Sequence, residues 1–140
     1  MVDIYSHYEG GLHCTAKHGP SGSQLGTDAP VDNHGKGATF SPTDLVATAL
    51  GTCMLTTMGL VANRHGWSVD GMDVHVKKEM TATPPRRIER LPVELRIPAQ
   101  VAAALDAGAR KELEHTAHTC PVRLSLLPAI DVPVTFQWGG

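Results

Sequence analysis

The longest uncharged stretch of the chain, residues 45–63, consists almost entirely of apolar residues, threonine and glycine. A start signal precedes it, because Ser41 can act as an N-cap and Asp44, three residues later, completes a capping-box pattern. A stop signal follows it, because two basic residues precede Gly66, which suits the position just after a helix end. The pattern therefore predicts one helix over residues 42–65.

Shorter segments with alternating apolar and polar positions lie on both sides of this helix. Such alternation is typical of half-buried strands, and clusters of Gly, Pro and Asn between them are typical of turns. Strands are predicted at 4–8, 12–16, 24–27, 72–77, 88–97 and 130–138, with a loop at 28–39. Helices are predicted over 99–118, interrupted near Gly108, and over 121–127. This order predicts a single α+β domain, residues 1–140, with an antiparallel sheet.

The central helix poses a problem of burial, because a helix that is apolar on every side needs cover on every side. Its length is close to that of a membrane span, but four threonines and two glycines within it argue against one. A sheet covers only one face, and monomers avoid large exposed apolar patches. We therefore predict a homodimer in which a partner helix approaches closely at Gly51 and Gly59. A monomer at micromolar concentration would contradict this prediction.

Composition excludes several classes of function. The net charge is −2 and the pI is about 6.4, so no basic surface for nucleic acid or an anionic membrane is expected. The two Trp, two Tyr and two Phe residues are too few for a base-stacking platform. The N-terminal sequence lacks the pattern of a signal peptide, which indicates a cytoplasmic protein. Three cysteines do not form a secreted disulfide framework.

The cysteines are the candidate reactive groups. Cys53 lies about three turns into the predicted central helix, where a buried and inert thiol is the usual interpretation. Cys120 directly precedes Pro121 and so occupies an N-cap, where free amides and the helix dipole are expected to lower a thiol pKa. Cys14 lies on a predicted strand and is interpreted as structural. None of the three cysteines by itself indicates a specific function.

Two motifs taken together resemble the OsmC/Ohr family, and specifically its OsmC-like branch. The first comprises Phe-Ser-Pro-Thr-Asp-Leu at 40–45 with Ala-Leu-Gly-Thr-Cys at 49–53. The second is Thr-Cys-Pro-Val at 119–122, followed by Leu-Ser-Leu at 124–126. The Thr-Asp-Ala-Pro loop at 27–30 also resembles that branch. The resemblance covers roughly residues 5–138.

The resemblance implies a fold and a chemistry. It implies an OsmC-like fold, in which antiparallel sheets wrap two central helices in an intertwined homodimer with its sites at the subunit interface. It also implies that Cys53 attacks an organic hydroperoxide and becomes a sulfenic acid, which Cys120 then resolves as a disulfide. A dithiol reductant, in some members a lipoyl protein, would restore both thiols. Sulfur alone would carry this chemistry, so no cofactor or metal is expected.

The chain departs from the best-studied members at the groups that activate the thiol. In those members an N-terminal Arg lies beside the nucleophilic thiolate and a Glu orients it, whereas this chain has no Arg before Arg64. The position of that Glu is Thr43, and Asp44 is the nearest acid. A thiol inside a helix needs another cation or hydrogen bond to ionise. Asp44, Thr43 and His18 are therefore the candidates for tuning the thiolate.

Further cations are candidates for the same role, namely His13 and Lys17 near the N-terminus and Arg123 one turn beyond Cys120. His18 is preferred among the N-terminal groups. The ordinary interpretation of His18 is a turn residue, and that of Arg123 is a solvated helix position.

Two other functions remain open from the sequence. His115, His118 and Cys120 are zinc-ligand residue types, but their spacing matches no standard zinc module. Alternatively, the chain is a non-catalytic redox sensor, or binds a small ligand at the dimer interface, which the missing N-terminal Arg favours. No dinucleotide, flavin or haem signature is present.

Overall fold

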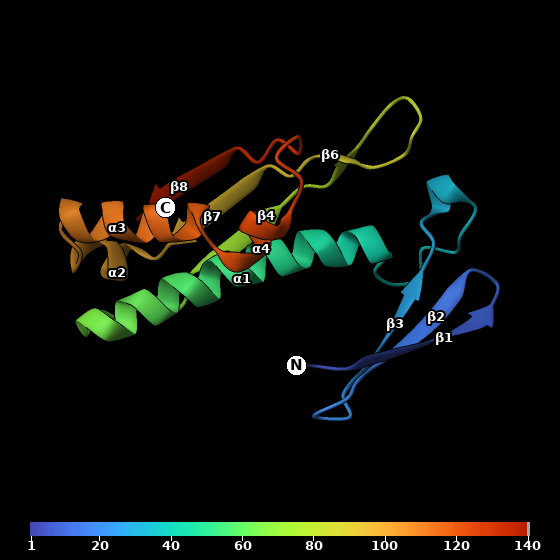
Figure 1. Cartoon of the computed structure of the whole chain (residues 1–140). Helices are drawn as coiled ribbons and strands as arrows, with labels where there is room; N and C mark the ends of the chain where they lie inside the picture. The colour runs from blue at the N-terminus through green and yellow to red at the C-terminus, as the bar shows by residue number, and fades with distance from the viewer. Residues whose placement is uncertain (140) are drawn as a thin grey trace. The chain divides into compact units, whose positions relative to one another are not determined.

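The computed structural model describes residues 1–139, which fold into short sheets and helices of a mixed α+β protein. Contacts group the chain into two compact units, Met1–Val46 and Ala47–Gly140, and each is described by itself. The strands are β1 (Ile4–Gly10), β2 (His13–His18), β3 (Gln24–Asp28), β4 (Asp73–Val76), β5 (Glu79–Met80), β6 (Ile88–Arg90), β7 (Val93–Ile97) and β8 (Val134–Trp138). The helices are η1 (Val31–Asn33), α1 (Pro42–His65), α2 (Ala99–Ala103), α3 (Ala107–His118) and α4 (Pro121–Ser125) (Figure 1).

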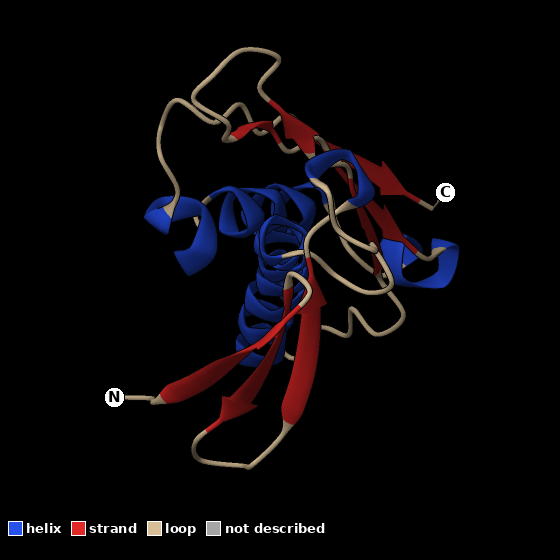
Figure 2. Cartoon of the chain, turned by 90° about the vertical axis from the view of Figure 1, so that its right-hand side faces the viewer, coloured by secondary structure: helices blue, strands red, loops and turns tan. Residues whose placement is uncertain are grey.

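The N-terminal unit is an antiparallel sheet in the order β1-β2-β3, drawn as three adjacent red strands in Figure 2. The three strands appear where alternation predicted them, and each extends slightly further. Register places Ile4, Tyr8 and Leu25 on one face of the sheet, and all three are exposed. The described residues of this unit contain only two buried side chains, Asp28 and Ser41. This sheet therefore presents an uncovered apolar face.

One ion pair anchors the loop that leads into α1. The imidazole Nδ1 of His13 lies 2.5 Å from Oδ1 of Asp28, and the amide of Ala38 donates to the other carboxylate oxygen at 3.0 Å. The hydrogen bond from His13 is the main reason why the pKa of Asp28 lies below its ordinary value of 3.8. The buried carboxylate thus ties β2 to the loop.

Helix α1 has the bounds that its end signals predict. The amide of Asp44 donates to Oγ of Ser41 at 3.0 Å, and the amide of Ser41 donates to Oδ2 of Asp44 at 2.8 Å. At the other end Gly66 is left-handed, with φ of 71°, and the amide of Trp67 donates to the carbonyl of Ala62 at 2.9 Å. The capping box and the glycine stop are both confirmed.

Only one side of α1 is covered within the chain. Leu50, Met54 and Met58 are fully buried, whereas the threonines on the opposite side are exposed and donate to carbonyls one turn back. Among residues 1–139, α1 is the one helix long and apolar enough to cross a membrane by length and composition, with a mean hydropathy of 1.8. The core helix of a soluble protein meets the same criteria of length and composition.

The C-terminal unit contains a three-stranded sheet in the order β4-β7-β8. Strands β4 and β7 are antiparallel, as predicted, but β7 and β8 pair in parallel. The prediction of a purely antiparallel sheet is therefore wrong for the last strand. The three helices between β7 and β8 carry the chain back to the end from which β7 began, and a parallel pair requires such a crossover.

Several further boundaries differ from the prediction: β8 begins at Val134 rather than at 130, and α4 ends at Ser125 rather than at 127. Residues 88–97 form two strands rather than one, because Leu91-Pro92 separates β6 from β7, and β6 pairs with β5, a strand that the sequence did not reveal. The break between α2 and α3 lies at Asp106, whose side chain caps α3 by accepting from the amide of Ala109 at 2.8 Å. Gly108 lies inside the first turn of α3 and does not interrupt it.

Gly51 holds α1 close to β4. A Cβ atom at this position would lie 2.9 Å from Cγ2 of Val76 and 3.1 Å from Cγ1 of Val74. Both side chains are β-branched and stiff, so neither moves aside cheaply. Gly51 therefore permits close packing within the chain, and not the approach of a partner helix that we predicted for it.

We expect Gly51→Ala to lower the free energy of unfolding by about 1–3 kcal/mol, because overpacking outweighs the higher helix propensity of alanine. Urea denaturation measures the change. In a Val76→Ala background the same substitution should cost clearly less, since the nearest obstructing methyl group is gone. An equal cost in both backgrounds would show that the contact with Val76 is not the cause.

Candidate functional site

Cys53 lies on α1, about three turns from its start, in the C-terminal unit. Its thiol is free and its side chain is half-buried, at the margin between the buried and exposed sides of the helix. The hydroxyl of Thr57 donates to the carbonyl of Cys53 at 2.9 Å. Cys53 is therefore less buried than the residues on the covered side of α1.

Cys120 caps the start of α4, as its position before Pro121 predicts. Its backbone is extended, and its sulfur accepts a hydrogen bond from the amide of Arg123 at an N···S distance of 3.4 Å. The residue is only 1% exposed. The cap fixes the rotamer of Cys120 and so determines where its sulfur lies.

The two thiols interact, and this interaction affects how Cys120 titrates. Burial, first of all, raises the pKa of the Cys120 thiol above its ordinary value of 9.0. The amides of Arg123 and Val122 act in the opposite direction, while both the hydrogen bond with Cys53 and the charge of Cys53 raise the pKa further. Our prediction that the helix end lowers the pKa of Cys120 is therefore wrong, because desolvation outweighs the N-cap.

Sequence reasoning missed the burial of Cys120, although a signal for it was present. Ala109, Leu113 and Ala117 are buried at a spacing of four residues along α3, and Cys120 continues the same stripe. A residue in register with a buried helix face is expected to be buried as well. That pattern could have predicted a raised thiol pKa.

The proposed tuning residues lie elsewhere in the chain. Asp44 and Thr43 belong to the cap of α1, where the Thr43 hydroxyl lies 3.2 Å from that of Ser41. Cys53 lies nine positions after Asp44, or about 13 Å along the axis at 1.5 Å per residue. His18 ends β2, with its Nδ1 atom 2.6 Å from the hydroxyl of Ser21. Their influence on Cys53 stays a prediction.

The structure gives the other candidate groups neighbours of their own. Cys14 lies on β2 opposite Tyr8 and Thr27. His115 and His118 are exposed, and the ring of His118 packs edge-on against Phe136. Among residues 1–139, no group of three or more His, Cys, Asp or Glu side chains could hold a metal ion.

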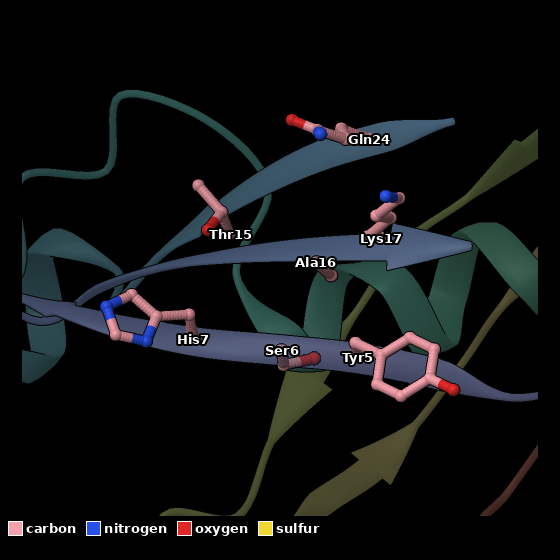
Figure 3. A pocket seen from close by; sticks show the side chains of 7 residues that line it. All are labelled: Tyr5, Ser6, His7, Thr15, Ala16, Lys17 and Gln24. Atoms are coloured by element: carbon pink, nitrogen blue, oxygen red, sulfur yellow. The ribbon is translucent and has the colours of Figure 1, made fainter. Parts of the chain in front are cut away.

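A shallow hollow of about 250 Å³ lies on the N-terminal sheet (Figure 3). Register pairs Tyr5 with Lys17 and His7 with Thr15 across β1 and β2. Figure 3 shows these side chains spread along the strands, with Gln24 on β3 beyond them. The hollow contains neither Cys53 nor Cys120, so the thiol pair is the better candidate site.

Comparison with known proteins identifies relatives along almost the whole chain. The family described as OsmC-like protein matches residues 34–135. A Psychrobacter arcticus protein, named provisionally as an osmotic stress induced and detoxification response protein, is 39% identical, with a TM-score of 0.89 over 98% of this chain and 96% of that one. No curated protein matches the chain.

More distant solved structures share the fold. An organic hydroperoxide resistance protein OsmC from Legionella pneumophila is 19% identical, with a TM-score of 0.76 over 98% of this chain and 96% of that one. A Vibrio cholerae protein, provisionally named for organic hydroperoxide resistance, was solved with captopril in one of its active sites. It is 18% identical, with a TM-score of 0.74 over 99% of this chain and 92% of that one.

Proposed function

The chain belongs to the OsmC-like protein family, and from this membership and its paired thiols we propose that it is a thiol-dependent peroxidase that reduces organic hydroperoxides. The observation that carries the proposal is the interaction of Cys53 on α1 with Cys120 at the start of α4. Proteins of the same fold from Legionella and Vibrio bear names that refer to organic hydroperoxide resistance, which supports this substrate class. The expected role is defence against oxidative stress in the cytoplasm.

Cys53 is the nucleophile of the first step. It is the more accessible thiol of the pair, whereas Cys120 is buried and its raised pKa keeps it protonated at neutral pH. The Cys53 thiolate attacks the terminal oxygen of the hydroperoxide, an S–O bond forms and the O–O bond breaks. The products are the Cys53 sulfenic acid and an alkoxide, which takes up a proton to become the alcohol.

Cys120 resolves the sulfenic acid in the second step. Its sulfur attacks that of Cys53, an S–S bond forms, and the sulfenic oxygen leaves as water after taking up the proton of the Cys120 thiol. A dithiol reductant, such as a lipoyl protein, then reduces this disulfide by exchange and is itself oxidised to a disulfide. One hydroperoxide and one dithiol thus yield an alcohol, water and an oxidised dithiol.

The proposed enzyme is a homodimer. The exposed side of α1 and the uncovered apolar face of the N-terminal sheet both require a partner surface. Sedimentation velocity at micromolar concentration should give twice the mass of one 14.9 kDa chain. A single species with the mass of one chain would contradict the dimer.

A coupled peroxidase assay tests the function. The reduced protein is supplied with dihydrolipoamide and, in turn, with cumene hydroperoxide, tert-butyl hydroperoxide and hydrogen peroxide. We expect turnover with both organic peroxides and slower turnover with hydrogen peroxide. If an organic peroxide forms the disulfide once and no turnover follows, the chain is a redox sensor. Absence of any reaction with all three peroxides would leave a ligand-binding role.

A further inference from the structure

The N-terminal sheet has a second face, opposite the uncovered apolar one, and the hollow drawn in Figure 3 lies on it. Because side chains alternate along a strand, two rows of them cross the sheet here. One row consists of Tyr5, Lys17 and Gln24, and the next contains His7 and Thr15. Thr15 is the shortest of these side chains, so the surface is lowest between the two rows.

The lining of the hollow is rich in hydrogen-bond donors and contains no acid. The ammonium group of Lys17, the hydroxyls of Tyr5 and Thr15 and the amide of Gln24 can all donate. The lining residues are Tyr5, Ser6, His7, Thr15, Ala16, Lys17 and Gln24, and none of them is Asp or Glu. In a chain with a net charge of −2, this is a locally positive site.

Most of these donors have no acceptor within the protein. Among residues 1–139, no hydrogen bond or ion pair engages the side chains of Tyr5, His7, Lys17 and Gln24. The next acid along β1 is Glu9, which accepts from the hydroxyl of Thr15 at 3.2 Å and lies 3.7 Å from Nε2 of His13. Glu9 is thus engaged outside the hollow, and the positive charge of Lys17 is not neutralised by it.

We propose that this hollow binds a small oxyanion, namely the carboxylate or phosphate group of a small molecule. Lys17 supplies the opposite charge, and Tyr5 and Gln24 lie directly beside it on the two neighbouring strands. Facing Cβ atoms on adjacent strands are about 5 Å apart, so one anion can contact more than one of these side chains. The volume of about 250 Å³ restricts the ligand to a small one.

An NMR titration of the whole protein with inorganic phosphate and, separately, with acetate tests the site. Sodium chloride keeps the ionic strength constant, and amide spectra report which residues respond. We expect saturable shifts at residues 5–7, 15–17 and 24, with a dissociation constant on the order of 1–10 mM for an exposed charged contact. Saturation by phosphate alone identifies a phosphate group as the ligand, by acetate alone a carboxylate, and by both an oxyanion of either kind.

Lys17→Gln and Lys36→Gln are matched variants, because each removes one lysine charge from the N-terminal unit. Lys36 lies on the loop between β3 and α1, outside the hollow, and both lysines are exposed, so the variants should fold normally. We expect Lys17→Gln to weaken binding about fivefold and Lys36→Gln to leave it within about 1.5-fold.

Two results would overturn the proposal. The first is the absence of saturation with both anions up to about 100 mM, because such shifts report only non-specific screening. The second is an equal loss of affinity in Lys17→Gln and Lys36→Gln, which would attribute the binding to the overall charge of the unit. Well-dispersed amide spectra of both variants establish that either result comes from folded protein.

Discussion

Cys53→Ser is expected to reduce peroxidase turnover by at least about three orders of magnitude, to the level of the uncatalysed reaction. A serine hydroxyl is not ionised at neutral pH and cannot be oxidised to a sulfenic acid, so the first bond to oxygen does not form. Consumption of cumene hydroperoxide with dihydrolipoamide as reductant measures the loss.

Cys14→Ser is the matched control for this change. Like Cys53→Ser, it replaces a sulfur atom by an oxygen atom, but on β2, where Cys14 lies opposite Tyr8 and Thr27. Turnover should stay within about twofold of wild type, as for a substitution outside the reacting groups. Unimpaired turnover in Cys53→Ser, or equal losses in the two variants, would refute the assignment of Cys53 as the nucleophile.

Cys120→Ser should block the second step and leave the first intact. After one equivalent of cumene hydroperoxide, we expect dimedone to label Cys53 almost completely, whereas the wild-type protein should be labelled little because Cys120 consumes the sulfenic acid. Mass spectrometry measures the adduct and its position. The serine hydroxyl can cap α4, so the site should remain folded.

The experiment is best repeated in a Cys14→Ser background, which removes the one other thiol of the chain. Persistence of an intramolecular disulfide in Cys120→Ser with Cys14 present would show that Cys14 can resolve the sulfenic acid. Dimedone found on Cys120 of the wild-type protein would reverse the proposed roles of the two cysteines.

The parts of the fold that the sequence predicted well are those with local causes. Helix α1 begins and ends where Ser41, Asp44 and Gly66 indicate, because capping bonds join residues only a few positions apart. The N-cap position of Cys120 follows in the same way from Pro121. Alternation along β4 likewise reports which face of that strand is covered.

The parts that it did not predict depend on distant contacts. The parallel pairing of β8 with β7 is determined by the path of three helices, and no residue of β8 itself encodes it. The raised pKa of Cys120 depends on how deeply the segment is packed. The separation of Cys53 and Cys120 along the sequence does not indicate that the two thiols lie close together. That expectation came from the resemblance to the family motifs.

Both cysteines lie in the unit Ala47–Gly140, and the sulfur of one chain interacts with the other sulfur of that same chain. Under the proposed mechanism, each polypeptide therefore contains a whole redox couple. A mixed assembly of one Cys53→Ser chain and one Cys120→Ser chain has no intact couple, and co-expression of the two genes would not complement the defect.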